Sequence, residues 1–425
     1  MKKSYFFLLI LFTITFFSCK TEKEIKLKTT VLIGEVIDRD SSKTVSLIKK
    51  SGKHLVSSIK IPIRNGKFSH IIHDEFIQEY ELAFDDELEI GSWRPIKFFN
   101  DKDTVKLNLH TKENYIKNNL IGGDLNNKVT FLNKEAKTLF QDKINHISFT
   151  KIDSLIKNNK WNSNEVASLY KQLNATEDYE KRRKIYEKLN NLRKNKKDLS
   201  VVGRFWKNKV DSINYEYNNW KNNTIDKDTS LVGYTMIIDK LYYSTDYNLL
   251  FIEKKLKKYH SKYKNHPYTS MTKNIINGIK NAKVNGYYSD FKSNTYNNEI
   301  IKVSSIIPKN KLTLIDLWTT WCAPCISKDK ELVPYYENLK KKGFEVFSVV
   351  NLNSKEEYLT ANDKYKYPWK VNYEINYEYN IWHKYNISRS GGSQFLVNSK
   401  GKILAINPEP KEIDSILNSM VKIKF

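Results

Sequence analysis

Two cysteines separated by two residues are the side chains of this chain best placed to do chemistry. Cys322 and Cys325 lie in the segment Trp321-Cys322-Ala323-Pro324-Cys325, directly after an apolar stretch. If a helix begins here, its first N–H groups and its dipole stabilise a thiolate on the first cysteine. The second cysteine can then attack a mixed disulfide and release the bound partner. Pro324 suits the first turn of such a helix, and Trp321 would shield one side of the pair.

Two other uses of a cysteine pair stay open. A zinc site needs four ligands, usually with a second pair of Cys or His at characteristic spacing. No second pair accompanies the motif, and His383 stands alone beyond it. A structural bond between Cys322 and Cys325 closes too small a loop to add much stability. We therefore predict no metal and no dissociable cofactor, because the two sulfurs carry the electrons themselves.

The third cysteine, Cys19, ends an apolar N-terminal run. Two lysines precede the uncharged segment 5–17, which Ser18 follows. A short positive region before an apolar run too short to span a membrane comfortably is typical of an export signal. The run resembles a bacterial lipoprotein signal, which implies that residues 1–18 are removed and that Cys19 carries the lipid. A signal with an incidental cysteine and an uncleaved anchor are the alternatives.

Export bears on the cysteine pair. Structural disulfides persist outside the cytosol, yet the chain has only 3 cysteines. We therefore expect the pair to exchange with other molecules. The resemblance to a lipoprotein implies a protein of the cell envelope of a Gram-negative bacterium, lipid-anchored and facing the periplasm, with residues 19–30 as a tether.

Composition limits the remaining classes. The chain has 425 residues, of which 40% are hydrophobic and 13% aromatic, enough for two or three packed domains. Mean hydropathy of −0.60 argues against a polytopic membrane protein. A net charge of +24 would attract phosphate or anionic lipid, but the lysines are spread along the chain and no nucleic-acid motif accompanies them. We favour a solvated, lysine-rich surface and no nucleic-acid partner.

The chain divides into three regions after the tether. Short strand-like runs over 31–125 predict an antiparallel β-sandwich, with Asn65-Gly66 as a hairpin turn between runs near 61–63 and 68–72. Apolar residues spaced by three or four over 126–286 predict helices, one of them starting at Thr176. From 287 to 425 strands and helices alternate, which predicts an α/β domain.

Within 287–425 the pattern places the cysteines at a strand-to-helix junction. The nearly continuous apolar run 312–318 predicts a buried central strand, and 344–350 a second one. Helices are expected over 325–342, 354–364 and 411–420, and a hairpin over 394–406. The chain is thus predicted to be multidomain, with a β-sandwich-like region, an α-helical middle and a C-terminal α/β region.

The segment from Leu314 to Cys325 resembles the active site of the thioredoxin superfamily, nearest the TlpA-like branch of exported thiol–disulfide oxidoreductases. The resemblance covers roughly residues 285–425. It implies that Cys322 is the attacking nucleophile and Cys325 the buried resolving thiol. Asp316 matches the buried acid of thioredoxins, and a carboxylate there could take the proton of Cys325. The alternative for Asp316 is a hydrogen-bonded strand residue with no catalytic role.

The chain departs from this family at two places. Gly392, with Ser393 after it, stands where thioredoxin folds carry a cis-proline facing the cysteines. A cis bond without proline is costly, so we expect a trans or mobile loop and altered substrate handling. TlpA-like proteins also often have Glu and Pro where Lys328 and Lys330 stand. The peroxidase relatives of the superfamily are set aside because Ile315 replaces the proline that they need.

We therefore expect an exported lipoprotein that exchanges disulfides with exported proteins, as a reductase by resemblance, with a membrane thiol reductant as its electron donor. The rival hypothesis is a lipid-anchored binding or scaffold protein in which the thioredoxin fold has weak or no exchange activity. Both cysteines and Asp316 are present, which favours the enzyme.

Overall fold

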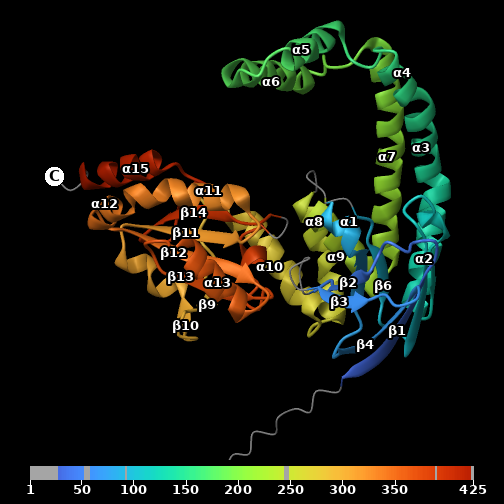
Figure 1. The fold of residues 1–425 in the computed structure, drawn as a ribbon, viewed down its shortest axis with the longest axis horizontal. Coiled ribbons are helices and arrows are strands. Elements are labelled where there is room, and N and C mark those ends of the chain that lie inside the picture. The colour runs from blue at the N-terminus through green and yellow to red at the C-terminus, as the bar shows by residue number, and fades with distance from the viewer. Residues whose placement is uncertain (1–26, 52–57, 91–92, 244–247, 388–389, 423–425) are drawn as a thin grey trace, which may run out of the picture.

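The computed structural model describes residues 27–51, 58–90, 93–243, 248–387 and 390–422. Figure 1 shows a β-rich N-terminal region, a helical arm rising from it, and a separate α/β region at the C-terminal end. This is the multidomain architecture that the sequence predicts. None of the helices in the described ranges is both long and apolar enough to cross a bilayer.

Two four-stranded sheets form the N-terminal sandwich, in the orders β4-β1-β7-β8 and β3-β2-β5-β6. Their inward side chains, among them Leu32, Leu82 and Val105, make one apolar core. Pairing is antiparallel except between β1 and β7, which run parallel. The elements are β1 (Lys28–Val36), β2 (Thr44–Lys49), β3 (Ile59–Pro62), β4 (Lys67–Asp74), β5 (Glu79–Phe84), α1 (Asp85–Glu89), β6 (Ile96–Phe99), β7 (Thr104–Leu109), η2 (Tyr115–Lys117) and β8 (Asn119–Ile121).

The predicted hairpin at Asn65-Gly66 is wrong in one respect. Both residues have positive φ, 49° and 69°, as a tight two-residue turn requires, and Arg64 pairs with Lys67 across it. The strands on either side then separate, because β3 pairs with β2 in one sheet and β4 with β1 in the other. The turn therefore connects the two sheets of the sandwich.

The helical middle begins with a long arm. Residues 124–157 form one helical run in which η3 and η4 are π-helical turns, and α7 stands beside this run (Figure 1). At the tip, α5 and α6 form a hairpin with a small core of its own, built from Val166, Leu169, Leu173, Ile185, Leu189 and Leu192. The elements are α2 (Asp124–Ala136), η3 (Lys137–Gln141), α3 (Asp142–Ile147), η4 (Ser148–Ile152), α4 (Asp153–Lys157), α5 (Asn164–Asn174), α6 (Tyr179–Lys194) and α7 (Val201–Lys227).

Three further helices, α8 (Leu231–Tyr243), α9 (Leu249–Lys262) and α10 (Pro267–Asn281), pack into the core beneath the arm. Helix starts follow the expected capping chemistry, with Ser163, Ser200 and Asn248 each accepting a backbone N–H of the first turn. The helix predicted to start at Thr176 is instead capped by Asp178, which accepts the N–H of Lys181 at 2.8 Å.

The C-terminal region is built on a seven-stranded sheet of order β10-β9-β13-β12-β11-β14-β15. The central strand β11 runs parallel to β12 and antiparallel to β14, and all of its residues are buried. The elements are β9 (Lys292–Asn294), β10 (Ile300–Lys302), η5 (Val303–Ser305), η6 (Ile307–Lys309), β11 (Leu312–Thr319), α11 (Ala323–Leu332), η7 (Val333–Tyr335), α12 (Tyr336–Lys341), β12 (Phe344–Leu352), α13 (Lys355–Tyr365), β13 (Val371–Ile375), α14 (Ile381–Lys384), β14 (Ser393–Asn398), β15 (Ile403–Ile406) and α15 (Pro410–Lys422).

Alternation along β11 places its side chains in two cores. Leu312, Leu314 and Trp318 face the side covered by α11, α12 and α13, whereas Ile315 and Leu317 face the core that contains α14. Asp316 therefore lies on the same face of the sheet as α11. The single helix expected over 325–342 is interrupted, because the chain turns through η7 at Val333-Pro334 before α12.

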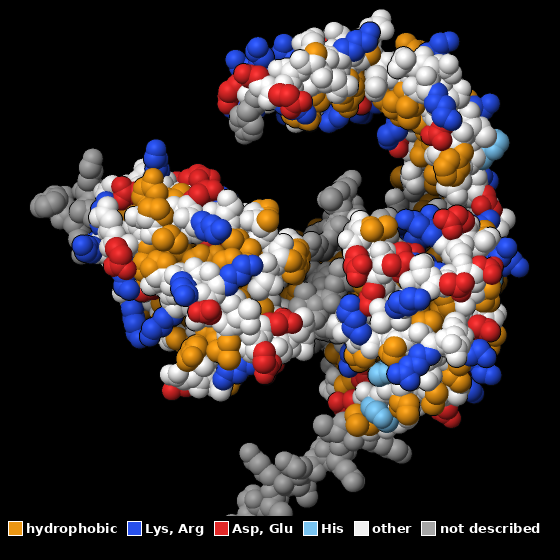
Figure 2. Space-filling model, in the orientation of Figure 1, with side chains coloured by type: hydrophobic (Ala, Val, Ile, Leu, Met, Phe, Trp, Pro, Cys, Tyr) orange, Lys and Arg blue, Asp and Glu red, His pale blue; other side chains and the backbone are white. Residues whose placement is uncertain are grey.

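Charge on the visible face of the molecule is mixed. In Figure 2, Lys and Arg side chains are scattered over all regions of that face and alternate with acidic and apolar ones. No single basic patch stands out there, which agrees with the expected solvated, lysine-rich surface.

Candidate functional site: a disulfide above two buried carboxyl groups

The two cysteines lie at the junction of the central strand and the helix after it. Cys322 is the N-cap residue of α11, and Cys325 lies in the first turn with Pro324 before it. A turn closed by the Cys322 N–H and the Thr319 carbonyl, at 3.0 Å, connects β11 to the helix. The two sulfurs are bonded at 2.04 Å. The strand, the turn and the helix start are those expected from the sequence.

The burial of the two cysteines differs from what the family resemblance implies. Cys322 is only 8% exposed, and Cys325 is partly exposed. The resemblance had made Cys325 the buried thiol. The reason is the loop before β14, where a Cβ added to Gly391 would lie 2.9 Å from the Cys322 sulfur. That loop covers Cys322 in the disulfide form.

Three of the other expected site residues lie at the edge of this pair. Trp321 is 59% exposed, so it stands beside the disulfide as a surface ring. Ala323 and Pro324 are also exposed. An exposed ring, a small side chain and a proline around a disulfide leave room for another polypeptide to approach.

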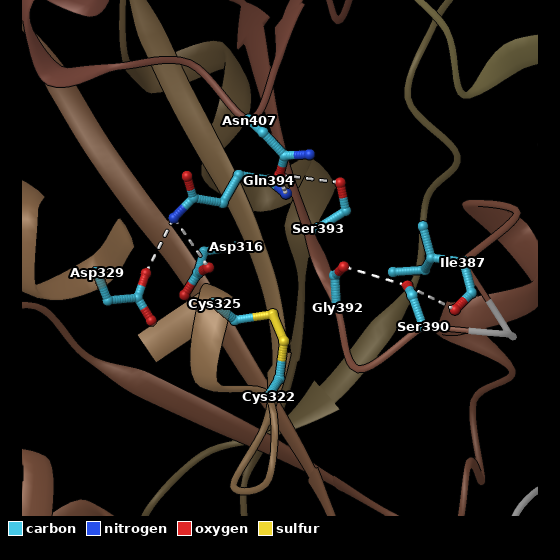
Figure 3. Close-up of a disulfide and its surroundings, with 10 residues drawn as sticks. All are labelled: Asp316, Cys322, Cys325, Asp329, Ile387, Ser390, Gly392, Ser393, Gln394 and Asn407. Atoms are coloured by element: carbon cyan, nitrogen blue, oxygen red, sulfur yellow. Dashed lines mark hydrogen bonds between the residues drawn. A yellow bond between two sulfur atoms is a disulfide. The ribbon is translucent and has the colours of Figure 1, made fainter. Parts of the chain in front are cut away.

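Gly392 faces the strand that carries the site. No described peptide bond is cis, so the Gly391–Gly392 bond is trans, which is one of the two arrangements expected for this loop. A Cβ at Gly392 would lie 1.9 Å from the Leu317 carbonyl oxygen. The Ser390 hydroxyl donates to the Gly392 carbonyl at 3.2 Å, and the Ser393 hydroxyl donates to Asn407 Oδ1 at 3.1 Å (Figure 3). Glycine is therefore required here by close backbone contact.

Asp316 lies buried behind the disulfide and is held by its neighbours in the sheet. Ser348 on β12 and Gln394 on β14 are its register partners on either side. The Ser348 hydroxyl donates to Asp316 Oδ2 at 2.6 Å, and Gln394 Nε2 donates to Oδ1 at 3.4 Å. Figure 3 shows the carboxyl beside Cys325. One row of polar side chains across three strands thus positions the acid.

A second buried acid, Asp329, lies on the same face of α11 as Cys325. The two residues are one helical turn apart, and the Asp329 side chain turns towards Asp316 (Figure 3). Gln394 Nε2 donates to Asp329 Oδ1 at 2.9 Å, so a single amide group bridges both carboxyl groups. We did not anticipate Asp329 from the sequence, although its helical spacing from Cys325 and the buried Leu332 is a signal that could have found it.

Burial changes the proton affinity of both carboxyl groups. It raises the pKa of Asp316 to about 6, although hydrogen bonds from Ser348 and Gln394 act in the opposite direction. Burial also raises the pKa of Asp329, together with the charge of Asp316, to about 9. At neutral pH the pair therefore holds one proton and one negative charge.

Two expectations lie away from this centre. Cys19, the expected lipid attachment site, lies outside the described residues. His383, the lone histidine beyond the motif, is buried against Tyr242 of α8. In the part of the chain that the structure describes, no three His, Cys, Asp or Glu side chains gather as metal ligands would.

Comparison with known proteins concerns the C-terminal region. Residues 284–406 match the model of the AhpC/TSA family, whereas no curated protein matches the chain. Among solved structures, the thioredoxin domain of a thiol-disulfide oxidoreductase from Bacteroides vulgatus is 19% identical, with a TM-score of 0.30, and the match covers 33% of this chain and 98% of that one. A thiol:disulfide interchange protein from Bacteroides sp. is 20% identical, with a TM-score of 0.28 and coverage of 33% and 89%.

The fold assignment rests on the strand order, the position of the disulfide and the family match. A mostly parallel centre with an antiparallel β14–β15 hairpin, and a Cys-x-x-Cys pair at the start of the helix after the central strand, is the thioredoxin arrangement that the sequence predicts. The C-terminal region therefore has a thioredoxin-like fold and residues 284–406 match the AhpC/TSA family model, as expected from the resemblance of the cysteine segment to TlpA-like thiol–disulfide oxidoreductases.

Proposed function

We propose that this thioredoxin-like oxidoreductase reduces disulfides of other exported proteins through Cys322 and Cys325. The observation that carries the proposal is the disulfide at the start of α11, directly beside the buried carboxyl group of Asp316. A helix start favours a thiolate on Cys322, and a buried base beside Cys325 serves the second step of exchange.

The reaction balances through the two sulfurs alone. In the reduced chain the Cys322 thiolate attacks a substrate disulfide, so a mixed disulfide forms and one substrate sulfur leaves as a thiolate. Cys325 then loses its proton to Asp316 and attacks the sulfur of Cys322. The Cys322–Cys325 bond forms as the bond to substrate breaks, and the second substrate sulfur leaves. Two electrons pass from the chain to the substrate.

The cycle needs a reductant to reopen the Cys322–Cys325 bond. A membrane-bound dithiol would supply two electrons by the same exchange chemistry in reverse. This electron donor accords with the proposed lipid anchor at Cys19, which would hold the chain at the periplasmic face of the cell envelope. Incorporation of labelled fatty acid into the full chain, and its loss in Cys19→Ala, tests the anchor directly.

A redox titration and an insulin-reduction assay test the exchange activity. The full chain with Cys19→Ala, so that only two thiols remain, is equilibrated in thiol–disulfide buffers and its free thiols are counted. We expect one reversible two-electron transition, and insulin reduction that is lost in Cys322→Ser. A wild-type rate equal to that of Cys322→Ser would refute the activity.

The Cys325→Ser variant identifies the substrates. It is expected to hold partners as mixed disulfides on Cys322, because the resolving thiol is absent. The captured proteins should be exported ones with disulfides of their own. The double variant with Cys322→Ser is the control that should capture nothing.

A second candidate role, partner binding by the N-terminal half, is favoured by one observation. A cavity of about 1850 Å³ lies between the sandwich and helices α2, α7, α8 and α9. Its wall includes the rings of Trp220 and Phe251 beside the half-buried Lys221 and Lys240. Burial lowers the pKa of both lysines, and the charge of Lys240 lowers that of Lys221 further.

This cavity suits an anionic, partly apolar segment of a partner. If binding there delivers substrates to the disulfide, Lys221→Gln with Lys240→Gln should reduce the set of proteins captured by Cys325→Ser. Insulin reduction should stay unchanged. If Cys325→Ser captures the same set of proteins with and without the lysine substitutions, the cavity has no role in substrate delivery, although the exchange activity itself stands.

A further inference from the structure

The exchange reaction needs one proton acceptor, but two buried carboxyl groups lie beneath the disulfide. Asp316 alone could accept a proton from Cys325. Yet Asp329 brings a second carboxyl group to the same buried space from α11, and both are completely or almost completely withdrawn from solvent. A buried ionised carboxylate is costly unless it is paired or hydrogen-bonded.

The hydrogen bonds around the pair are unequal. Asp316 accepts from both Ser348 and Gln394, one on each of its oxygens. Asp329 accepts from Gln394 on Oδ1 only, and its Oδ2 has no donor of ordinary geometry among the described residues. Asp316, the carboxyl group that accepts more hydrogen bonds, is thus the one suited to carry the negative charge.

A hydrogen bond between the two carboxyl groups requires a proton on one of them. Gln394 Nε2 lies 3.4 Å from Asp316 Oδ1 and 2.9 Å from Asp329 Oδ1, so the two carboxyl groups meet around one amide nitrogen. Two neighbouring carboxylates without a proton would repel each other. The unpartnered Oδ2 of Asp329 is the atom that needs a proton of its own. This arrangement makes Asp329 the donor and Asp316 the acceptor.

The other groups that face the pair are neutral. Tyr367, after α13, lies beside Asp329, and its buried hydroxyl makes no hydrogen bond of ordinary geometry. Burial and the two carboxyl groups raise the pKa of Tyr367, so the phenol stays protonated. Gln394 and Ser348 do not titrate, and Cys325 is the remaining titratable neighbour. No described cation is therefore at hand to neutralise the carboxyl groups, and the shared proton takes that role.

We propose that Asp329 is a positioning residue that stays protonated, donates a hydrogen bond to the Asp316 carboxylate, and thereby sets the proton affinity of the group that deprotonates Cys325. This rests on the proposed exchange function. During resolution, the Cys325 proton moves to Asp316 while the proton of Asp329 stays on the pair. The Cys322–Cys325 bond forms, the bond to the partner sulfur breaks, and the pair returns its extra proton to the departing thiolate or to water.

The test is the pH profile of the resolving step. The reduced full chain with Cys19→Ala is mixed with 5,5′-dithiobis(2-nitrobenzoate), which first forms a mixed disulfide on Cys322 and releases one coloured thiolate. Attack by Cys325 then releases the second one, and the rate of that second phase is followed by absorbance. The wild-type rate should fall about tenfold per pH unit below the lower transition of the pair, near pH 6.

Two substitutions at Asp329 separate its roles. Asp329→Asn keeps an N–H donor to Asp316. The fall in the second-phase rate on the acid side of the pH profile, the acid limb, should therefore stay near its wild-type pH, while the transition of Asp329 at higher pH disappears. Asp329→Leu removes the donor, so the acid limb should move up by about one pH unit, because Asp316 then holds its charge less well. Glu331→Gln removes an exposed acid from the same helix and should leave the profile unchanged.

The outcomes are distinguishable from a failure of the exchange proposal. If the wild-type chain shows no second phase, exchange itself is refuted. If the second phase occurs and Asp329→Leu keeps the wild-type acid limb, the role of Asp329 is refuted while exchange stands. Should the leucine variant fail to fold, infrared spectra of the oxidised chain decide. At a pH between the transitions of Asp316 and Asp329, the C=O band of a protonated carboxyl group must be present in wild type and in Glu331→Gln. It must be absent in Asp329→Asn. Persistence of that band in Asp329→Asn would overturn the proposal.

Discussion

The imidazole Nε2 of His383 lies 2.6 Å from the hydroxyl oxygen of Tyr242, in a buried contact between α14 and α8. Close backbone packing accompanies it, since a Cβ at Gly278 of α10 would lie 2.5 Å from the His383 carbonyl oxygen. The thioredoxin-like region is thus attached to the helical middle by buried polar and backbone contacts. The chain after α14 continues into the loop that covers Cys322.

Tyr242→Phe should weaken this attachment. The variant keeps the ring but leaves His383 Nε2 buried without the hydroxyl, which costs about 1–3 kcal/mol of unfolding free energy. The measurement is the urea midpoint of the oxidised full chain. Tyr215→Phe, at an exposed position on α7, is the matched control and should unfold like wild type. Equal midpoints for the two variants would show that the contact contributes nothing.

Lys50→Met should destabilise the junction between the sandwich and α8. The Lys50 side chain is 5% exposed, its Nζ lies 3.0 Å from Glu79 Oε1, and it also pairs with Asp239. Removing a buried cation leaves its acids uncompensated, at a cost of about 3–5 kcal/mol. Lys97 also contacts Asp239, at 2.7 Å, and still compensates part of its charge. The expected loss of unfolding free energy is therefore near the lower end of that range.

The control for Lys50 is a surface pair of the same residue types. Lys207 lies 2.6 Å from Asp211 one turn along α7, with both side chains about half exposed. Lys207→Met should change the unfolding free energy by no more than about 0.5 kcal/mol. The measurement is the thermal unfolding midpoint of Lys50→Met and of Lys207→Met. Equal midpoints for the two variants would contradict the prediction.

Gly392→Pro, which introduces the proline of other thioredoxin folds, should not improve this protein. The Cβ of any side chain at Gly392 meets the Leu317 carbonyl oxygen and lies 2.7 Å from Trp318 Cα. These are backbone atoms of a central strand and cannot move cheaply, so we expect a loss of about 1–3 kcal/mol. The melting temperature should fall in both the oxidised and the reduced form.

Gly391→Ala, unlike Gly392→Pro, should affect the oxidised and the reduced form differently. A Cβ at this position meets the side chain of Cys322, at 2.5 Å from its Cβ. The added Cβ would also lie 2.9 Å from the Cys322 sulfur. Because reduction frees that sulfur to rotate away while the Cβ contact stays, the destabilisation should be larger in the oxidised form than in the reduced one. Melting curves with and without reductant measure this difference, and an equal loss in both forms would argue against it.

Stability should fall as the pH rises, because of Asp329. Its pKa in the folded chain is about 9, above the ordinary value of 3.8, so the folded state keeps a proton that the unfolded chain loses. The stabilisation is complete below about pH 4 and is lost as the pH rises towards 9, by at most about 1.4 kcal/mol per pH unit. Asp316 acts in the same direction up to about pH 6.

Asp329→Asn removes this dependence. The variant should gain stability relative to wild type as the pH rises, as seen in urea midpoints measured across the range. Glu331→Gln, on the exposed side of α11, should follow the wild-type slope. Parallel curves for wild type and Asp329→Asn would mean that Asp329 is ionised in the folded chain at every pH tested.

Local pattern was sufficient for much of the site. The apolar run of β11, the start of α11 at the cysteines and the helix over 354–364 all depend on neighbours within a few residues, and the structure confirms each of them. Asp316 was singled out by the family resemblance, as the match to the buried acid of thioredoxins, and alternation along β11 places it on the face that α11 covers. Helical spacing also predicted the helices of the middle region, and the apolar residues of α5 and α6 form a small core there.

Contacts between distant segments were not predictable in this way. Nothing near Asn65-Gly66 shows that β3 and β4 pair in different sheets, since each strand is chosen by partners elsewhere in the chain. The covering of Cys322 by Gly391 likewise depends on a loop far along the sequence. Family resemblance alone had made Cys325 the more buried cysteine.

The sequence by itself determined the reactive pair and the strand-to-helix junction that holds it, because periodicity and capping act over one or two turns of chain. It indicated the acid behind the pair through the resemblance of the cysteine segment to thioredoxins. Only the tertiary structure decided that Asp329 and Gln394 meet Asp316 in one buried space. Three strands and a helix must pack before those side chains share a low-dielectric environment. Because proton affinity depends on that shared environment, it is a property of the fold and not of any single segment.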